Sequence, residues 1–246
     1  MEEHVEGGRN TYGEIIGILM QERLFPRIPG DIGNASTFNF PVRMQMIRGV
    51  DISTRFKLFE GNESLIQPFI HGAKALEEAG VRAITSCCGF LILFQDIIAE
   101  AVNVPVFMSS LMLIPIVHRM LKKGQSIGVI TSNATDKGLG KRHYQAAGAG
   151  DIPIETIGME GSNAWETIAK DKTVLNPEQV KQDLIDRAQL LIEKNPTIGA
   201  LVLECANMPP YAKAIQDRVN LPVFDIVTFI NFVYSAVVQR KYKGYL

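Results

Sequence analysis

Cysteine is scarce in this chain, with three in 246 residues, and none of the spacings typical of a metal site occurs. A zinc site needs three or four ligands, usually in CxxC or HExxH patterns, and neither pattern is present. The four histidines follow no motif. The GDIGN segment at residues 30–34 is not the GxGxxG pattern of a dinucleotide site. We therefore expect an activity that uses neither a metal nor any other cofactor.

An excess of one charge is also lacking, because 25 basic and 26 acidic residues nearly cancel. No stretch combines Lys and Arg with aromatic residues as nucleic-acid surfaces do, so we expect no nucleic-acid partner. The opening MEEHVEGGRN is acidic and lacks the basic and apolar regions of a signal peptide. This pattern predicts a cytoplasmic protein whose cysteines are reduced.

One apolar run, residues 221–238, approaches the length of a transmembrane helix. Pro222, Asp225 and Asn231 interrupt it, which argues against a membrane span. Its first residues read as a strand, and this leaves a helix over residues 226–239. We expect that helix to be buried against a sheet, and we expect no membrane partner.

What the chain does contain is an internal repeat, since residues 83–107 recur as residues 200–224 without a gap. Identical residues at this constant spacing are Ala83 and Ala200, Cys88 and Cys205, Ile98 and Ile215, Val102 and Val219, Asn103 and Asn220, Pro105 and Pro222, Val106 and Val223, and Phe107 and Phe224. Each copy reads as an apolar strand, a cysteine, a helix and a second strand. That order implies a parallel βαβ unit in each half of the chain.

The repeat gives each half one cysteine at the carboxyl end of a strand. Open parallel sheets bind their ligands at that edge, so Cys88 and Cys205 are predicted to face one cleft between two related halves. Cys87 has no counterpart, because Glu204 occupies its place in the second copy. Since side chains on a strand alternate between faces, we expect Cys87 to point away from the cleft and to be structural.

The remaining pattern predicts further strands over residues 14–20, 42–49, 126–130 and 152–157, and helices over residues 63–79, 109–122, 137–147 and 178–194. Strands that alternate with helices favour an α/β protein. We predict two pseudo-symmetric Rossmann-like lobes, each a mostly parallel four-stranded sheet flanked by helices, with the active site in the cleft between them. Gly124 ends the first lobe in this interpretation.

Two segments are candidates for substrate binding. The long loop at residues 23–41 fits a lid that offers Arg27, Asn34, Ser36 and Thr37, and it fits a surface Ω-loop equally well. The second segment follows the strand at residues 126–130 and carries hydroxyl and amide side chains, which suit an anion or simply cap a helix. Its candidate residues are Thr131, Ser132, Asn133 and Thr135.

With these features the chain resembles the aspartate/glutamate racemase superfamily, whose cofactor-independent enzymes include racemases of amino acids and hydantoins, maleate isomerases and arylmalonate decarboxylases. The resemblance covers most of the chain. It implies that Cys88 in TSCCGF and Cys205 in LECANMPP are the catalytic cysteines. It also implies that the last helix packs back on the first half, so the first lobe would comprise residues 1–124 and 226–246, and the second residues 125–225.

The resemblance further implies a small-molecule carboxylate or a related compound as the substrate, and a homo-oligomer, either a dimer or an assembly of dimers. Residues expected beside the substrate are Ser86, Gly89, Phe90, Thr131, Ser132, Asn133, Thr135, Ala206, Asn207 and Asn34. Where racemases of acidic amino acids tend to place Thr after each cysteine, this chain has Gly89 and Ala206. Phe90 and Met208 would then make a more apolar pocket, or they would belong to the core.

The implied activity is racemisation or epimerisation at a carbon next to a carboxylate or carbonyl. One cysteine removes the proton as a thiolate, and the other donates a proton from the opposite face. A helix that begins after each cysteine would lower the thiol pKa without a cofactor. Alternatives in the same superfamily are a maleate-type cis-trans isomerase and a malonate decarboxylase. A non-enzymatic ligand-binding or thiol redox-sensing protein is a further alternative.

Overall fold

A computed structural model of the protein describes residue 4 and residues 7–245. Its two four-stranded sheets are parallel throughout and share one strand order, β2-β1-β3-β4 in the first half and β6-β5-β7-β8 in the second. The predicted α/β fold of two related halves is therefore confirmed. The strands are β1 (Ile16–Gln21), β2 (Val42–Ile47), β3 (Ala83–Ser86), β4 (Val106–Phe107), β5 (Ser126–Thr131), β6 (Ile154–Gly158), β7 (Ile198–Leu203) and β8 (Val223–Phe224).

The central strands of both sheets are buried on both faces. Every residue of β1, β3, β5 and β7 is buried, whereas β2 and β6 at the sheet edges are mostly half-buried. Helices that cover both faces of a parallel sheet impose this pattern, and it explains the near-continuous apolar runs of these strands.

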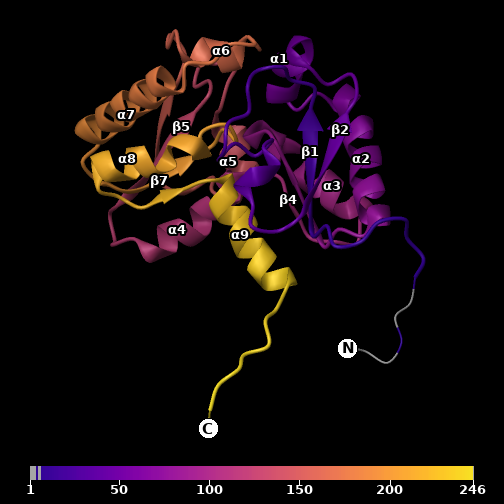
Figure 1. The fold of residues 1–246 in the computed structure, drawn as a ribbon. Helices are drawn as coiled ribbons and strands as arrows, with labels where there is room; N and C mark the ends of the chain where they lie inside the picture. Colours follow the sequence, from indigo (N-terminus) through magenta and orange to yellow (C-terminus); the bar gives the residue numbers. More distant parts are fainter. Residues whose placement is uncertain (1–3, 5–6, 246) are drawn as a thin grey trace.

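Helices connect the strands in both halves (Figure 1). They are α1 (Arg55–Phe59), α2 (Ile66–Ala79), α3 (Gln95–Ala101), α4 (Ile114–Met120), α5 (Lys141–Ala146), α6 (Trp165–Ala169), α7 (Pro177–Lys194), α8 (Ala212–Val219) and α9 (Ile226–Val237). Short 3₁₀ helices are η1 (Ala35–Thr37), η2 (Ile52–Thr54), η3 (Glu63–Leu65), η4 (Gly89–Phe94), η5 (Ser110–Leu113) and η6 (Pro209–Tyr211). Gly80 ends α2 with a left-handed φ of 94°, a conformation that glycine adopts more easily than other residues.

Helix α9, yellow in Figure 1, begins at the Asp225 cap, whose carboxylate accepts the N–H of Thr228 at 2.7 Å. It then contacts the first half of the chain. The Phe229 ring lies 4.9 Å from that of Phe107, and Tyr234 stacks on Phe40 at 3.6 Å between ring centroids. Within the part of the chain that is described, no helix combines the length and the apolar character needed to cross a membrane.

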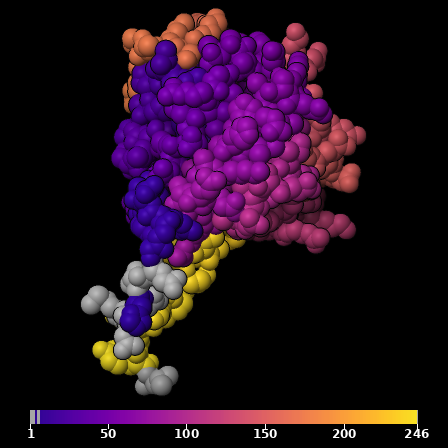
Figure 2. All heavy atoms as spheres, turned by 90° about the vertical axis from the view of Figure 1, so that its right-hand side faces the viewer, coloured from indigo at the N-terminus to yellow at the C-terminus, as the bar shows by residue number. Residues whose placement is uncertain are grey.

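The two halves share a hydrophobic core. One cluster of buried side chains includes Ile18 of β1, Val129 of β5, Val202 of β7 and Phe229 of α9. Burial of this common apolar surface holds the two sheets in a defined relation, with their carboxyl ends facing one another. Figure 2 shows the face of the first half, from which the described parts of both chain ends extend at the same end of the molecule.

Candidate active site

The two repeat cysteines lie at equivalent points of the two sheets. Strand β3 ends at Ser86, and Cys88 directly precedes η4 in an extended conformation (φ −147°, ψ 121°). Strand β7 ends at Leu203, and Cys205 follows two residues later. Each cysteine is thus placed just beyond the carboxyl end of a buried central strand, where the sequence repeat predicts it.

Both cysteines line one cavity of about 220 Å³ between the two halves. The ends of two further strands also contribute to its wall, through Gln21 at the end of β1 and through Ser132 and Asn133 after β5. The wall contains carboxyl ends from both sheets because the halves face each other across the cavity. Two thiols on opposite halves therefore border one cavity of small-molecule size.

The two thiols have similar surroundings, which favour the protonated form, so the expected lowering of the thiol pKa by a following helix is not found. Burial raises the pKa of Cys88 and of Cys205 well above the ordinary value, and the charge of Glu204 raises both further. The backbone N–H of Phe90 lowers the pKa of Cys88, and that of Asn207 lowers the pKa of Cys205. Each sulfur therefore has an amide donor two residues further along the chain, which stabilises a thiolate once it forms.

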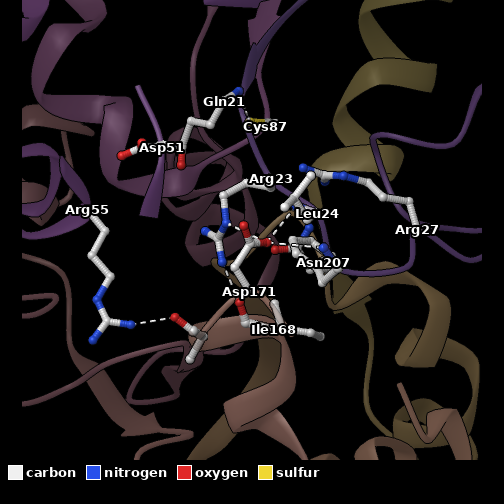
Figure 3. Close-up of polar contacts among 12 residues, drawn as sticks. Gln21, Arg23, Leu24, Arg27, Asp51, Arg55, Cys87, Ile168, Asp171 and Asn207 are labelled. Carbon is white, nitrogen blue, oxygen red and sulfur yellow. Dashed lines mark hydrogen bonds and ion pairs between the residues drawn. The ribbon is translucent and has the colours of Figure 1, made fainter. Parts of the chain in front are cut away.

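Three arginines add positive charge to the cavity wall. Arg27 donates to Asp31 at 2.9 Å, and Arg23 lies 3.2 Å from the carboxylate of Asp171. Arg55 donates to the carbonyl oxygen of Ala169. Figure 3 shows Arg23 between Asp171 and the carbonyl of Ile168, with Arg55 reaching the same region from its own side.

Asp171 joins the two halves next to the cavity. Its carboxylate accepts the backbone N–H of Leu24 at 2.7 Å and that of Phe25 at 3.1 Å, in addition to the pair with Arg23. Its own backbone is left-handed, with φ of 59°. The segment after β1 is in this way bound to the turn after α6, about 145 residues later in the chain.

The long loop after β1 is organised around Asp31. This buried carboxylate accepts the N–H of Gly33 at 2.7 Å and pairs with Arg27, while the Asn34 amide donates to the carbonyl of Arg27 at 2.9 Å. Arg27 lines the cavity, whereas Asn34 caps η1. Of the four loop residues considered as substrate contacts, Arg27 therefore borders the cavity, and Asn34, Ser36 and Thr37 do not.

The structure brings together only part of the predicted set. Cys88, Cys205, Ser132, Asn133 and Asn207 all line the cavity. The position of Cys87 differs from the expectation, because it lines the same cavity and its sulfur accepts the N–H of Gln21 at 3.2 Å. Strand β3 has already ended one residue earlier, so the alternation of side chains no longer applies at the two cysteines.

The other predicted residues do not line the cavity. Phe90 is buried and stacks on Phe59 with ring centroids 3.9 Å apart, because η4 turns its side chain into the core. Gly89 and Ala206 are also buried. The remaining side chains are engaged in their own hydrogen bonds: Ser86 with the carbonyl of Met108 at 2.6 Å, Thr131 with Glu204 at 2.7 Å, and the exposed Thr135 with Asn133 at 2.7 Å.

Several cavity residues escape prediction from the sequence. Arg23 lies in the loop after β1, Arg55 begins the single-turn helix α1, and Trp165 begins α6. No repeat or motif marks these three residues. Gln21 could have been predicted from the sequence, because it ends a strand at the edge of the sheet that carries the cysteines. Among the described residues, no group of three or more His, Cys, Asp or Glu side chains is arranged to hold a metal ion.

The family model described as Asp/Glu/hydantoin racemase matches residues 42–230, and the chain belongs to this family. It is 26% identical over 238 residues to dimethylsulfoniopropionate lyase of Durusdinium sp. clade D, which covers 93% of this chain and 77% of that protein. It is 27% identical over 239 residues to dimethylsulfoniopropionate lyase 6 of Emiliania huxleyi (strain CCMP1516), covering 93% of this chain. The chain spans 61% of the length of that second relative.

Solved structures with the same fold include a mutant of arylmalonate decarboxylase, with a TM-score of 0.62 and 15% identity over 92% of this chain and 95% of that one. Allantoin racemase from Klebsiella pneumoniae has a TM-score of 0.61 and 15% identity over 91% of this chain and 88% of that one. At such identities the likeness establishes the fold. The chain is thus an enzyme of the racemase superfamily, whose members differ in the reactions they catalyse.

Proposed function

We propose that this protein is a cofactor-independent racemase or epimerase that inverts a carbon next to a carboxylate or carbonyl, such as that of an amino acid or a hydantoin-like compound. The observation that carries the proposal is that Cys88 and Cys205 line one cavity from opposite halves. Inversion needs an acid and a base on opposite faces, because a single base returns the proton to the face it left. Two equivalent thiols meet this requirement.

The proposed reaction starts with one thiol losing its proton. The resulting thiolate takes the α-proton of the substrate, and the opposite thiol gives its proton to the other face of the same carbon. The charge that develops on the carboxylate needs donors nearby. The cavity supplies Ser132, Asn133 and the guanidinium of Arg55, which forms no ion pair with a carboxylate among the described residues.

A second candidate is β-elimination from dimethylsulfoniopropionate, favoured by the relatives of that name that match 93% of the chain. A thiolate would again take the α-proton, but the electron pair would form a carbon–carbon double bond as the carbon–sulfur bond breaks. Dimethyl sulfide and acrylate would leave. Phe59 and Trp165 line the cavity, and aromatic rings suit a cationic sulfonium group.

One experiment separates these reactions. The purified protein is incubated in D₂O with chiral amino acids, other chiral carboxylates and hydantoins, and the α-proton signal and chirality are followed by NMR and chiral chromatography. Parallel samples with dimethylsulfoniopropionate, maleate and an arylmalonate are assayed for dimethyl sulfide, fumarate and carbon dioxide. Exchange with inversion supports the racemase, and dimethyl sulfide release supports the lyase. Fumarate or carbon dioxide as the main product would replace both with an isomerase or a decarboxylase.

The Cys88→Ser/Cys205→Ser double variant is the control for whichever reaction is found. It should lose the activity by several orders of magnitude, as removal of catalytic groups usually does. A double variant with near-normal turnover would contradict the proposal, because the chemistry would then not depend on the thiols.

A further inference from the structure

Glu204 occupies the place in the second half that Cys87 occupies in the first. The N–H of Cys87 donates to the carbonyl of Leu19 at 3.0 Å, and the N–H of Glu204 donates to the carbonyl of Ile130 at 2.9 Å. The two residues thus take the same position beside the first strand of each sheet. A carboxylate has replaced a thiol at a point directly next to Cys205 in the chain.

The Glu204 side chain lies between the two cysteine loops, which are the segment after β3 that carries Cys88 and the segment after β7 that carries Cys205. It is 1% exposed, and its Oε2 accepts the hydroxyl of Thr131 at 2.7 Å. Its other oxygen, Oε1, has no hydrogen-bond partner among the residues that the structure describes. A Cβ at Gly89 would lie 2.3 Å from Oε1, so only the glycine after Cys88 leaves room for this carboxyl group.

The titratable groups that face Glu204 are acidic ones. They are Cys88 before η4, its own neighbour Cys205, and Tyr144 on α5, and burial together with the charge of Glu204 raises the pKa of each. In the described part of the chain, Glu204 takes part in no ion pair with Lys, Arg or His. A thiolate that formed while Glu204 was ionised would therefore be a second buried negative charge with no cation paired to the first.

We propose that Glu204 is a positioning residue that controls the ionisation of both cysteines, and that either thiol becomes a thiolate more readily while Glu204 holds a proton. The role rests on the proposed two-thiol chemistry, but it concerns the protein without bound substrate. The cysteine releases its proton to solvent, and the neutral carboxyl group keeps its own. Glu204 does not contact the substrate in this account, because it does not border the cavity.

Because of burial, Glu204 changes its charge near neutral pH, and this change would alter the ionisation of the two thiols. Burial raises its pKa to about 7, although donation from Thr131 and the backbone N–H of Ser132 opposes this. Below that pH the carboxyl is neutral and does not oppose a thiolate. Above it the carboxylate makes each thiol harder to ionise, so the gain in thiolate with rising pH should be smaller than for an ordinary thiol.

The test measures thiol reactivity without any substrate. Cys88 and Cys205 are modified with methyl methanethiosulfonate from pH 5.5 to 8.5 in the Cys87→Ser background, with and without Glu204→Gln, and the rate at each site is read by mass spectrometry. The two proteins should react at similar rates at pH 5.5. At pH 8.5 the Glu204→Gln protein should react about tenfold faster or more at both cysteines, the effect of removing a neighbouring charge.

Three results would overturn the proposal: a rate ratio that does not change with pH, slower modification after Glu204→Gln, or faster modification at Cys205 alone. Glu166→Gln is the matched control, because Glu166 also borders the cavity but is paired with Lys170 at 2.7 Å, and its ratio should stay near one. If Glu204→Gln does not fold, Thr131→Val serves instead. That variant removes a bond to the ionised carboxylate and should speed modification in the same direction, and an unchanged or slower rate would overturn the proposal.

The result is independent of turnover. Faster thiol modification in a protein that inverts no substrate would leave the role of Glu204 intact and remove only the proposed racemase activity. A protein that inverts a substrate but shows an unchanged rate ratio would support the proposed racemase activity and remove the proposed role of Glu204.

Discussion

The side-chain amide of Asn207 donates to the carboxylate of Asp31 at 2.8 Å, which joins the loop after the second cysteine strand to the long loop of the first half. The other Asp31 oxygen pairs with Arg27. The Cys205 thiol donates to the side-chain amide oxygen Oδ1 of Asn207 at 3.4 Å. One carboxylate therefore orients an arginine of the cavity wall and, through Asn207, the loop that carries a proposed catalytic thiol.

Asp31→Ala should destabilise the protein by about 3–5 kcal/mol, the usual cost of removing one partner of a buried ion pair, because Arg27 is left with an unpaired charge. Chemical denaturation measures the change. Glu14→Gln is the control, since Glu14 pairs with Arg43 at 2.6 Å near the surface and both side chains are about a third exposed. That substitution should cost about 1 kcal/mol or less. Equal losses in the two variants would contradict a central role for Asp31.

Variants of the two proposed catalytic cysteines should fail in complementary ways if each cysteine serves one face of the substrate. Cys88→Ser should lose racemisation by several orders of magnitude but should still exchange deuterium slowly into one enantiomer, through Cys205. Cys205→Ser should do so with the opposite enantiomer. NMR of each separated enantiomer in D₂O measures the exchange. If both variants favour the same enantiomer, a single-cysteine chemistry becomes the better explanation.

Cys87→Ser should keep most of the activity even though Cys87 borders the cavity. Its sulfur is already engaged by the N–H of Gln21, and a serine hydroxyl can accept the same bond. The measurement is kcat/KM with the substrate identified in the panel. A loss as large as that of Cys88→Ser would mean that the wrong member of the pair is assigned to catalysis.

Asp171→Ala should weaken closure of the cavity, because it removes two bonds to backbone N–H groups and the pair with Arg23. We expect KM to rise more than kcat falls, together with a loss of stability of about 3 kcal/mol. Asp171→Asn is the matched variant, because asparagine tolerates the left-handed backbone and can still accept the N–H bonds. It should lose less than the alanine variant, and equal losses would show that the backbone bonds are unimportant.

Glu204 should make the folded protein less stable at high pH. Its pKa is raised from 4.5 to about 7 on folding, so the folded state holds the proton more tightly between these values. Stability from this group therefore decreases as pH rises from about 4.5 to about 7, by at most on the order of 3 kcal/mol. Denaturant unfolding of the wild type and Glu204→Gln at pH 5 and pH 8 tests this. The variant should gain relative to the wild type at pH 8, and parallel pH profiles would rule the contribution out.

Much of the architecture could be predicted because it follows from short-range patterns. Apolar runs with a constant spacing between the two copies indicate parallel strands, and the four central strands are buried where those runs lie. The carboxyl-end rule then brings Cys88 and Cys205 to one edge of each sheet. The predicted orientation of Cys87 was wrong because β3 ends at Ser86, and the last residue of a strand is poorly marked in the sequence.

The sequence by itself determined the two related halves and the pair of thiols at matching strand ends, since local periodicity and a gap-free internal repeat encode them. Only the tertiary structure decided which other side chains meet those thiols. Arg55 reaches Ala169 and Arg23 reaches Asp171 across more than 100 residues of chain, and Glu204 meets Gly89 through the contact of the two cysteine loops. No local pattern marks such pairs, because their contact depends on how the shared core sets one sheet against the other.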